Sequence, residues 1–290
     1  MGQRTFFLFA NPGKPESLGT VGAAARMVAE QGCRVLMDGW LHGRLGIGEP
    51  MGIADMPAEA SAVIALGGDG TLLRALPAAA QKRVPVLGIN VGHTGFLLEA
   101  APDNLEDAIG RLLRGEYHVE ERMMLRCQIN GGRIELVMNE IALTRGQNPS
   151  SIVADVHADG ERVFTIHGDG VLVSTPTGTT GYALSAGGPV VHPGVDCMTV
   201  VPISSHVMHH RPMVLPPQAR IRLRVLNNRG SLHQVSMDGQ IVMDLTTDTA
   251  IDVIRAPQTA RFIRFGEERF LTRLTQKQTE WSNNRFGGGS

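Results

Sequence analysis

Hydrophobic and polar positions in the first part of the chain follow two periods in turn. Short apolar runs, which are typical of buried strands, occupy residues 5–10, 34–37, 62–66 and 84–89. Apolar residues at helical spacing predict helices over residues 17–31, 71–81 and 102–114. Strands that alternate with helices favour a parallel sheet with helices on its faces. Residues 39–57 are rich in Gly and Pro without a clear period, so we expect a loop there.

The pattern changes near residue 115, after which short β-branched runs alternate with tight turns as far as about residue 265. Asn130-Gly131 and Asp159-Gly160 each separate two such runs, which is typical of a β-hairpin. These features predict an antiparallel β domain, interrupted by one helix after Thr179. The polar residues 270–281 are compatible with a helix that returns to the first domain. We therefore predict an α/β domain of residues 1–115 with 266–290, and a β-rich domain of residues 116–265.

The overall composition excludes several classes of protein. Of 290 residues, 42% are hydrophobic and 19% are charged, which is typical of a soluble globular chain. The net charge of −1 offers no basic face to nucleic acid, and no apolar stretch approaches the length of a membrane span. We expect a cytoplasmic protein, because its cysteines form neither a disulfide framework nor a zinc motif: Cys33, Cys127 and Cys197. Ordinary polar histidines, without a metal site, are expected at His206, His209 and His210.

Gly67-Gly68-Asp69-Gly70-Thr71 is the first motif that carries chemistry. Glycines after a buried strand let the backbone approach a ligand, and the next helix offers free N–H donors to phosphate. A carboxylate in this loop can accept a proton from an attacking hydroxyl or help to hold Mg²⁺. The alternative is a turn in which Asp69 only caps the helix. No Walker-type G-x-x-x-x-G-K-[ST] motif is present, which excludes a P-loop enzyme.

Two further motifs lie in the predicted β domain. Asn139-Glu140 offers an amide and a carboxylate at a strand end, where they can grip neighbouring hydroxyls or base edges. Residues 168–189 read GDGVLVSTPTGTTGYALSAGGP, in which a strand enters a hydroxyl-rich turn before a short helix near Thr180. The Ser and Thr hydroxyls, together with helix N–H groups, predict a surface that binds oxyanions and sugars.

In order and spacing these segments resemble those of the NAD kinase family, whose motifs are GGDGT, NE and DG…STPTG[ST]T[AG]Y…LSAGGP. Further matches are residues 85–96 (PVLGINVGHTGF), Arg211-Pro212 after His206, and Asp238-Gly239-Gln240. The resemblance spans roughly residues 62–240, and the long third motif separates it from enzymes that share only GGDGT. It implies an enzyme that transfers the γ-phosphoryl group of ATP to the 2′-hydroxyl of NAD's adenosine ribose, giving NADP, with Mg²⁺ as cofactor.

The resemblance also implies roles for residues at matching positions. Asp69 would accept the proton of the 2′-hydroxyl, with Gly70 in the phosphate loop and Arg74 as a phosphate contact. NAD contacts are implied for Asn139 and Glu140 on the adenosine side, and for His167 and Asp169 near the nicotinamide half. A wall around the adenine and ribose, with one further NAD contact, is implied for Thr180, Gly181, Tyr182, Ala183, Leu184, Ser185 and Gln240. Many members carry Ala at the Gly181 position, so the missing methyl should loosen this wall slightly.

Three expectations concern partners and specificity. The active site should lie in the crevice between the two domains, where open α/β sheets bind ligands. A homodimer or homotetramer is implied by the family and favoured by the many strand edges of the β domain. The resemblance also implies that a bulky residue at the His167 position favours NAD over NADH. The alternatives are a lipid or sugar kinase that shares only GGDGT, and a dinucleotide sensor without catalysis.

Overall fold

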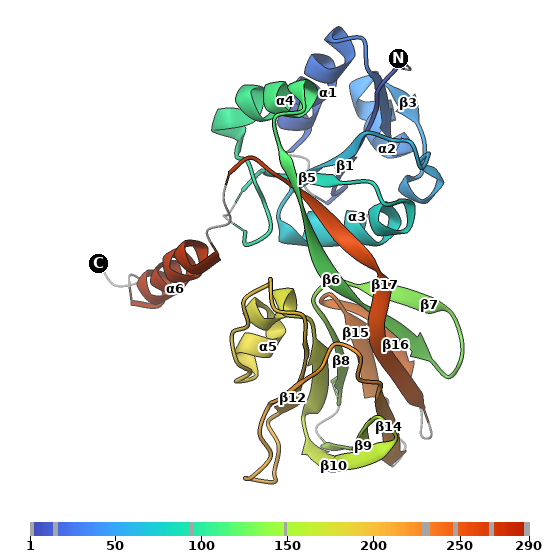
Figure 1. The fold of residues 1–290 in the computed structure, drawn as a ribbon, viewed down its shortest axis with the longest axis vertical. Coiled ribbons are helices and arrows are strands. Elements are labelled where there is room, and N and C mark those ends of the chain that lie inside the picture. The colour runs from blue at the N-terminus through green and yellow to red at the C-terminus, as the bar shows by residue number, and fades with distance from the viewer. Residues whose placement is uncertain are drawn as a thin grey trace. The chain divides into compact units, whose positions relative to one another are not determined.

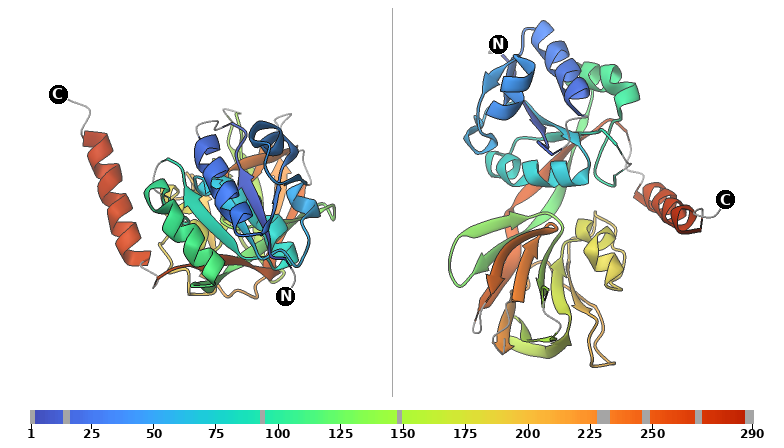
Figure 2. Two further views of the ribbon diagram at one scale, coloured as in Figure 1. Left: turned by 90° about the horizontal axis from the view of Figure 1, so that it is seen from above. Right: turned by 180° about the vertical axis from the view of Figure 1, so that it is seen from behind.

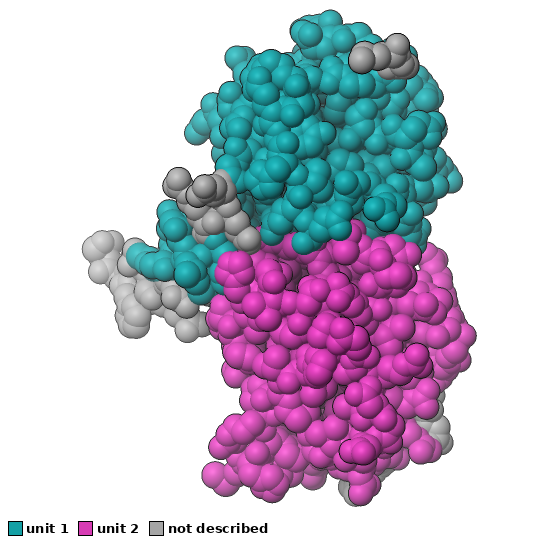
Figure 3. Space-filling view, in the orientation of Figure 1, with its two compact units in different colours: residues 1–121, 261–290 teal, residues 122–260 magenta. Residues whose placement is uncertain are grey.

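The computed structural model describes residues 3–13, 17–92, 95–147, 150–227, 233–245, 249–266 and 270–286. The chain forms two compact units, shown in two colours in Figure 3: unit 1 comprises residues 1–121 and 261–290, and unit 2 comprises residues 122–260. The chain enters unit 2 within strand β6 (His118–Ile129) and leaves it within strand β17 (Ala250–Arg264). No helix within the described ranges is both long and apolar enough to cross a membrane.

Unit 1 is built on a parallel sheet with the strand order β17-β5-β4-β1-β2-β3 (Figure 1). Its other strands are β1 (Thr5–Ala10), β2 (Arg34–Met37), β3 (Glu49–Pro50), β4 (Ala62–Gly67) and β5 (Val86–Asn90). All residues of β1 and β4 are buried. Helices that cover both faces of a parallel sheet leave no solvent-exposed side, which explains these continuous apolar runs.

Helices lie on both faces of this sheet, as Figures 1 and 2 show. The α-helices of unit 1 are α1 (Leu18–Glu30), α2 (Gly39–Leu45), α3 (Asp69–Lys82), α4 (Leu105–Arg114) and α6 (Phe270–Phe286). Helices α1 and α4 share one core cluster with the sheet, and α3 packs against β4 and β5. The helix α4 is preceded by the 3₁₀-helix η3 (Pro102–Asn104) and ends at Gly115, whose φ of 76° is left-handed.

The prediction of a loop over residues 39–57 is wrong. Its first part forms α2, and its remainder holds β3 and the 3₁₀-helix η2 (Ile53–Asp55). Helix α2 is only 7 residues long and buries Leu41 alone, so it leaves no apolar period in the sequence. Gly46, in the left-handed conformation, ends it.

The sheet of unit 1 has a topological switch point, where successive strands are added first on one side of β1 and then on the other. From β1 the chain moves to β2 on one side, whereas β4 pairs with the other side of β1. In open α/β sheets, ligands bind beyond the carboxyl ends of strands at such a switch point. The residues that follow β1 and β4 therefore lie where unit 1 is expected to bind a ligand.

Unit 2 is a sandwich of two antiparallel sheets, which confirms the predicted fold class. One sheet has the order β10-β9-β14-β17-β6-β7 and the other β13-β12-β11-β8-β15-β16. Their strands are β7 (Ile134–Val137), β8 (Glu140–Thr144), β9 (Ile152–Ala158), β10 (Glu161–Gly168), β11 (Gly170–Ser174), β12 (Met198–Ile203), β13 (Met213–Leu215), β14 (Ile221–Asn227), β15 (His233–Met237) and β16 (Gln240–Leu245). Side chains from both sheets meet in one hydrophobic core.

Both predicted hairpins of unit 2 are confirmed. Asn130-Gly131 joins β6 to β7, and Asp159-Gly160 joins β9 to β10. Both residues of each turn have positive φ, as a type I′ turn requires. The predicted helical interruption is also present, as the 3₁₀-helix η4 (Thr177–Thr180) followed by the short helix α5 (Tyr182–Ser185).

Candidate active site

The loop between β4 and α3 begins the candidate site in unit 1. A Cβ atom placed on Gly67 would lie 2.2 Å from Oγ1 of Thr71, so only glycine lets the chain turn here into the helix. A Cβ atom on Gly68 or Gly70 would meet nothing within 4 Å, which leaves open space beside the loop. The N–H groups of Thr71 and Leu72 donate to the carbonyl oxygen of Gly68, at 2.9 and 3.3 Å. The backbone N–H groups of Asp69 and Gly70 lie ahead of them at the start of α3, so this open space adjoins two candidate anion donors.

The carboxylate of Asp69 is held by a distant segment. Its Oδ2 accepts a hydrogen bond of 2.8 Å from the backbone N–H of Phe96, and its Oδ1 accepts one of 3.1 Å from Leu97. A Cβ atom on Gly95 would lie 2.1 Å from Oδ1, so a side chain there would collide with the carboxylate. These bonds do not run to the first turn of α3, so they give no support to a simple helix cap. In the matched run 85–96, residues 93 and 94 lie outside the described part of the chain.

Arg74 lies one turn further along α3. Its Nη1 donates to Oδ1 of Asn11 at 3.3 Å, and its guanidinium carbon lies 6.0 Å from the centre of the Phe9 ring. Desolvation raises the pKa of Asp38, while the positive charge of Arg74 counteracts that rise. Asn11 and Asp38 did not stand out in the sequence. Each directly follows a parallel strand, β1 or β2, which is the one sequence feature that points to them.

The second group of predicted residues lies in unit 2, around the hairpin turn Asp238-Gly239. Both turn residues have positive φ, 49° and 75°, as in a type I′ turn. Oδ2 of Asp238 accepts a bond of 2.9 Å from the N–H of Met138, and its Oδ1 accepts one of 2.6 Å from Asn139. Desolvation raises the pKa of Asp238 to about 6, and these backbone donors oppose the rise. The turn thus braces the strand end that carries Asn139 and Glu140.

Glu140 is the first residue of β8 and is buried. Its Oε2 has no hydrogen-bond partner among the described residues. Desolvation, with a smaller contribution from the charge of Asp238, raises the pKa of Glu140 to about 7. A Cβ atom on Gly181 would lie 3.3 Å from this Oε2 and 3.9 Å from Nδ2 of Asn139. Asn139, Glu140 and Gly181 therefore adjoin, and a buried carboxyl without a partner is a candidate ligand contact.

The hydroxyl-rich turn serves the fold more than the surface, which corrects the expected role of its hydroxyls. Ser174, Thr175 and Thr179 are fully buried. Their hydroxyls donate to the backbone carbonyl oxygens of Asn139 (3.1 Å), Met138 (2.7 Å) and Pro176 (2.6 Å), respectively. Small hydroxyl side chains commonly satisfy nearby backbone groups in this way. The turn consequently holds the carbonyl groups of Met138 and Asn139, whose N–H groups are held by Asp238.

The residues of the segment predicted to form a wall, 180–185, differ in their exposure to solvent. Gly181, Tyr182 and Ser185 are exposed, Thr180 and Leu184 are half-buried, and Thr180 donates its hydroxyl to the carbonyl of Thr177 at 3.1 Å. Ala183 is fully buried in a small cluster with Ala142, Leu172, Val201 and Ile203. Desolvation raises the pKa of Tyr182, and the charges of Asp169 and Glu140 add to that rise. The tyrosine hydroxyl thus lies within the field of both carboxylates.

Asp169 and His167 lie at the junction of β10 and β11. Nε of Arg145 donates to Oδ1 of Asp169 at 2.6 Å, and this bond lowers the pKa of the aspartate. The rings of His167 and His206 lie 4.7 Å apart between centres. Arg145 was missed in the sequence because it carries no motif of its own. Gln240 is exposed at the start of β16, directly after the turn at Asp238.

The three histidines of the H-x-x-H-H run form contacts typical of a polar surface. Nδ1 of His210 lies 3.0 Å from Oγ of Ser205, and the rings of His209 and His210 are 5.4 Å apart. Arg211 donates to the carbonyl oxygens of Met208 and His210, so it stabilises this turn. Within the described ranges no group of three or more His, Cys, Asp or Glu side chains is arranged to hold a metal ion.

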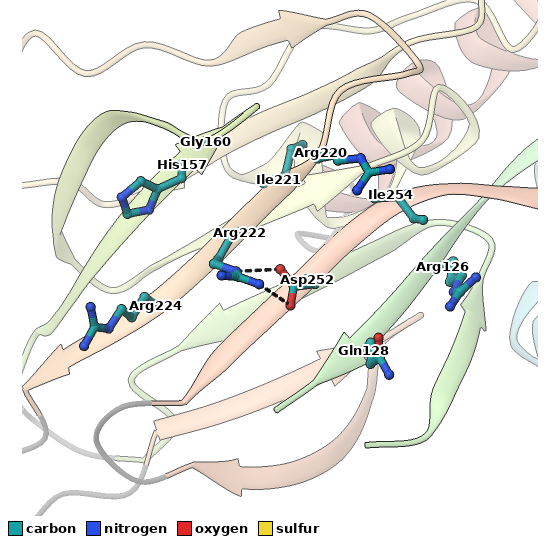
Figure 4. Close-up of a pocket in the computed structure, with 10 residues that line it drawn as sticks. All are labelled: Arg126, Gln128, His157, Gly160, Arg220, Ile221, Arg222, Arg224, Asp252 and Ile254. Carbon is teal, nitrogen blue, oxygen red and sulfur yellow. Dashed lines mark hydrogen bonds and ion pairs between the residues drawn. The ribbon is translucent and has the colours of Figure 1, made fainter. Parts of the chain in front are cut away.

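Unit 2 also carries a separate basic groove of about 800 Å³, drawn in Figure 4. It lies on strands β6, β9, β14 and β17, and its lining includes Arg126, Arg220, Arg222, Arg224 and Asp252. Arg222 donates to Asp252 through Nε at 2.6 Å and through Nη2 at 3.0 Å. None of the predicted site residues lines this groove, so it is distinct from the carboxylates around Glu140.

Comparisons with known proteins match both units. Residues 6–117 match the model of the ATP-NAD kinase N-terminal domain, and residues 138–265 match that of the ATP-NAD kinase C-terminal domain. The chain is 37% identical over 278 residues to an NAD kinase of Methanopyrus kandleri, covering 92% of this chain and 99% of that protein. It is 34% identical over 312 residues to an NAD kinase of Nocardia farcinica, covering 98% and 95%.

Two solved structures share the fold. Yeast NADH kinase complexed with NADH is similar with a TM-score of 0.85 and 23% identity, over 94% of this chain and 86% of that one. An NAD kinase from Archaeoglobus fulgidus in complex with ATP is similar with a TM-score of 0.71 and 25% identity, over 95% and 98%. Because two family models together span most of the chain and relatives match along nearly its full length, the chain belongs to the ATP-NAD kinase family.

Proposed function

We propose that Asp69 is the proton acceptor in the family's reaction, the transfer of the γ-phosphoryl group of ATP to the 2′-hydroxyl of NAD's adenosine ribose. The observation that carries this proposal is the carboxylate held by the N–H groups of Phe96 and Leu97 at the start of α3. Each carboxylate oxygen has two lone pairs, so one remains on each oxygen for an incoming proton. A general base must lie within hydrogen-bond reach of that proton, and a fixed carboxylate meets this need without reorganising.

On the phosphate side, we propose that the N-terminus of α3, Gly70 and Arg74 contact ATP. The helix dipole and the free N–H groups favour negative charge at this end. Arg74 keeps further N–H donors beyond its single bond to Asn11. Bidentate pairing of arginine with phosphate would then orient the transferred group.

On the acceptor side, we propose that Asn139 and Glu140 bind the adenosine half of NAD. The unpartnered Oε2 of Glu140 supports this role, because a ligand hydroxyl would satisfy it. Gly181, Tyr182 and Ser185 are exposed, so they can contact the adenine and ribose. Ala183 is buried, so it would act only indirectly, by packing that holds its exposed neighbours in position. His167, Asp169 and Gln240 remain proposed contacts toward the rest of the dinucleotide.

Mg²⁺ is proposed as the accompanying cation. No cluster of three or more acidic, His or Cys side chains is arranged for a metal in the described chain, which fits an ion bound mainly through substrate phosphates and one or two carboxylates. Asp69 is the carboxylate that would hold it. The ion would neutralise charge on the phosphates during transfer.

We also propose that the chain forms a homodimer or homotetramer. Edge strand β16 exposes Ile241, Val242 and Met243 by 66%, 45% and 48%, and edge strand β13 exposes Val214 by 55%. Apolar edge strands are sites where a second chain can pair. Light scattering at micromolar concentration would contradict this if it gave the mass of a monomer. A cytoplasmic location is proposed as well, since all three cysteines are free and buried.

A coupled assay of NADP formation tests the catalytic proposal. With ATP, NAD and Mg²⁺, the wild-type chain should form NADP, and the Asp69→Asn variant should bind NAD but form NADP far more slowly. Asp103→Asn serves as the matched control, because Asp103 is an exposed acidic residue in η3 of the same unit. Equal losses in both variants would contradict a special role for Asp69.

A further inference from the structure

The segment 96–98 of unit 1 is held from both sides of its backbone. Its N–H groups at Phe96 and Leu97 donate to Asp69. Its carbonyl oxygens accept from arginines: Nη1 of Arg273 donates to Phe96 at 3.2 Å and to Leu98 at 3.1 Å, and Nη1 of Arg264 donates to Leu97 at 2.9 Å. Asp69 therefore shares this segment with two arginines that lie more than 160 residues away in sequence.

One peptide group carries the most direct connection. The carbonyl of Phe96 and the N–H of Leu97 belong to the same planar trans peptide, so they point in opposite directions and rotate together. Arg273 holds the carbonyl end of this plane, and Oδ1 of Asp69 holds the N–H end. A rotation of the plane away from Arg273 would therefore turn the N–H away from the carboxylate.

Buried charges anchor the two arginines. Oε2 of Glu99 accepts from Nη1 of Arg264 at 3.1 Å and from Nη2 of Arg273 at 3.3 Å, and Oε1 accepts the N–H of Phe265 at 2.9 Å. Nε of Arg264 donates to Oε2 of Glu120 at 2.7 Å. The side chains of Arg264 and Glu99 are only 6% and 9% exposed. Breaking a buried ion pair by removal of one partner is costly, so Glu99 and Glu120 hold Arg264 in place, and Glu99 also holds Arg273.

The position of Arg273 differs from that of the other members of this network. Arg264 lies on β17 and Glu99 follows β5, both within the sheet region of unit 1, whereas Arg273 lies on the final helix α6. Its side chain is 33% exposed, so it is the accessible end of the network. Helix α6 starts at Phe270, which is buried, and Arg273 is one turn further along.

We propose that Arg273 is a positioning residue for phosphoryl transfer, which holds the peptide 96–97 so that its N–H fixes the carboxylate of Asp69. This inference rests on the proposed role of Asp69 as proton acceptor. The final helix thereby contributes to catalysis through the peptide 96–97. Without Arg273 the peptide gains freedom and the carboxylate loses a fixed donor, so the reactive geometry is populated less often. NAD contacts in unit 2 do not change, so kcat should fall while the affinity for NAD stays constant.

The test compares Arg273→Ala, Arg273→Lys and the control Thr272→Ala, an exposed neighbour on α6. We expect the kcat of Arg273→Ala to fall roughly tenfold to a hundredfold, the range of a misplaced catalytic group, with the KM for NAD changed by less than about twofold. Arg273→Lys should recover part of the loss, and guanidinium ion at millimolar concentration should restore part of the activity of Arg273→Ala. A fall in thermal midpoint without any rescue would indicate a structural role only and would overturn the proposal.

A double-mutant cycle separates this proposal from the one on which it rests. If Arg273 acts through Asp69, Arg273→Ala should cost little further activity in the Asp69→Asn background. Equal fold-losses from Arg273→Ala in both backgrounds would refute the positioning role and leave the role of Asp69 intact. Near-normal turnover of Asp69→Asn would instead refute the proton acceptor itself.

Discussion

Asp69 in unit 1 and Asp238 in unit 2 use the same kind of hydrogen bond in different surroundings. Each carboxylate accepts two backbone N–H groups from a segment that is distant in sequence. Asp69 stands at the N-terminus of the 14-residue helix α3, next to glycines that leave open space. Asp238 stands in a hairpin turn beside Glu140, a second carboxyl, and desolvation raises its pKa to about 6.

The comparison shows that backbone donors alone do not define a catalytic carboxylate. At Asp69 the helix terminus favours negative charge at the same place, which supports the proposal that the phosphates and the base adjoin there. At Asp238 the donors fix a strand end, and the charge of Asp238 adds to the desolvation that makes Glu140 harder to ionise. We therefore propose a chemical role for Asp69, whereas Asp238 holds the strand end at Met138 and Asn139 in place.

The largest expected effect comes from Asp69→Asn. Asn has nearly the same shape but cannot take up the proton, so kcat should fall by roughly 10²–10⁴, the usual contribution of general-base catalysis. NAD affinity should stay close to that of the wild type. The thermal midpoint should fall modestly, because the amide Nδ2 of Asn is a donor and cannot accept the second of the two N–H groups, from Phe96 and Leu97. Stopped assays of NADP formation, with NAD binding measured by calorimetry, check both points.

Mg²⁺ titration sharpens this result. If Asp69 serves mainly as a ligand of the ion, high Mg²⁺ should restore the activity of Asp69→Asn, whereas a lost base cannot be restored in this way. A simple helix cap predicts a third pattern: about 1 kcal/mol of stability lost and nearly normal turnover. That last pattern would remove the contrast between Asp69 and Asp238.

The second prediction concerns Glu140, whose pKa is raised to about 7 from 4.5 by desolvation. The folded protein binds this proton more tightly than the unfolded chain, so the free energy of unfolding falls as the pH rises from about 4.5 to about 7 and is level above that. The full loss amounts to about 3.5 kcal/mol, for about 2.5 units at about 1.4 kcal/mol per unit, and about 2.5 kcal/mol of it falls between pH 5 and pH 8. Glu140→Gln mimics the protonated acid and should remove this slope.

Urea unfolding at pH 5 and pH 8 measures the effect. The wild type should lose stability between the two pH values by the amount above, relative to Glu140→Gln. Glu135→Gln is the control, because Glu135 lies on the same unit but pairs with Arg133 at an accessible site. Parallel pH profiles of wild type and Glu140→Gln would show that Glu140 ionises as freely as an exposed carboxyl.

Much of the fold was predictable because its elements follow simple periods. The strand 34–37, the helix that became α1 and both type I′ hairpins were all predicted from spacing and turn residues. Helix α2 was not, since seven residues with one buried side chain leave no period. The fold class and family could be read from the sequence because the glycine loop and the long third motif are local.

Much less of the site's geometry was predictable, since its decisive contacts join distant parts of the chain. Asp69 is bonded to Phe96 and Leu97, 27 and 28 positions away, and Asp238 to Met138, 100 positions away. The hydroxyls of Ser174 and Thr175 were expected to face a ligand. They face the backbone instead, because buried carbonyl groups nearby needed donors. Sequence identifies which residue types are present, whereas packing decides which way they point.

The third prediction tests the exposed end of the unit 2 site. His167 is exposed, and its ring lies 4.7 Å from that of His206. We expect the wild type to favour NAD over NADH, because a bulky ring at this position distinguishes the planar oxidised nicotinamide from the puckered reduced ring. His167→Gly should reduce the ratio of kcat/KM for NAD over NADH by several-fold, about 1 kcal/mol.

The test is to measure kcat/KM for NAD and for NADH with the wild type and with His167→Gly. The ratio of the two values is insensitive to errors in enzyme concentration. Equal kcat/KM for NAD and NADH in the wild type would refute the preference itself. An unchanged ratio in His167→Gly would assign the preference to another residue of unit 2.

The smallest effect is expected from Gly181→Ala, which probes the contact between the predicted wall and Glu140. The φ of Gly181 is −97°, outside the left-handed region, and an added Cβ atom would lie 3.2 Å from the carbonyl of Gly178 and 3.3 Å from Oε2 of Glu140. Alanine reduces the freedom of the unfolded chain, which stabilises the fold by about 0.4–1 kcal/mol where the site accepts it. The methyl group would also shield Glu140 from water, which penalises its ionised form. The gain in the free energy of unfolding should therefore be present at pH 5 and smaller at pH 8.

Gly19→Ala on α1, where a Cβ atom meets nothing within 4 Å, should give a gain that does not depend on pH. If urea unfolding shows the same gain for Gly181→Ala at both pH values, the methyl group does not reach Glu140.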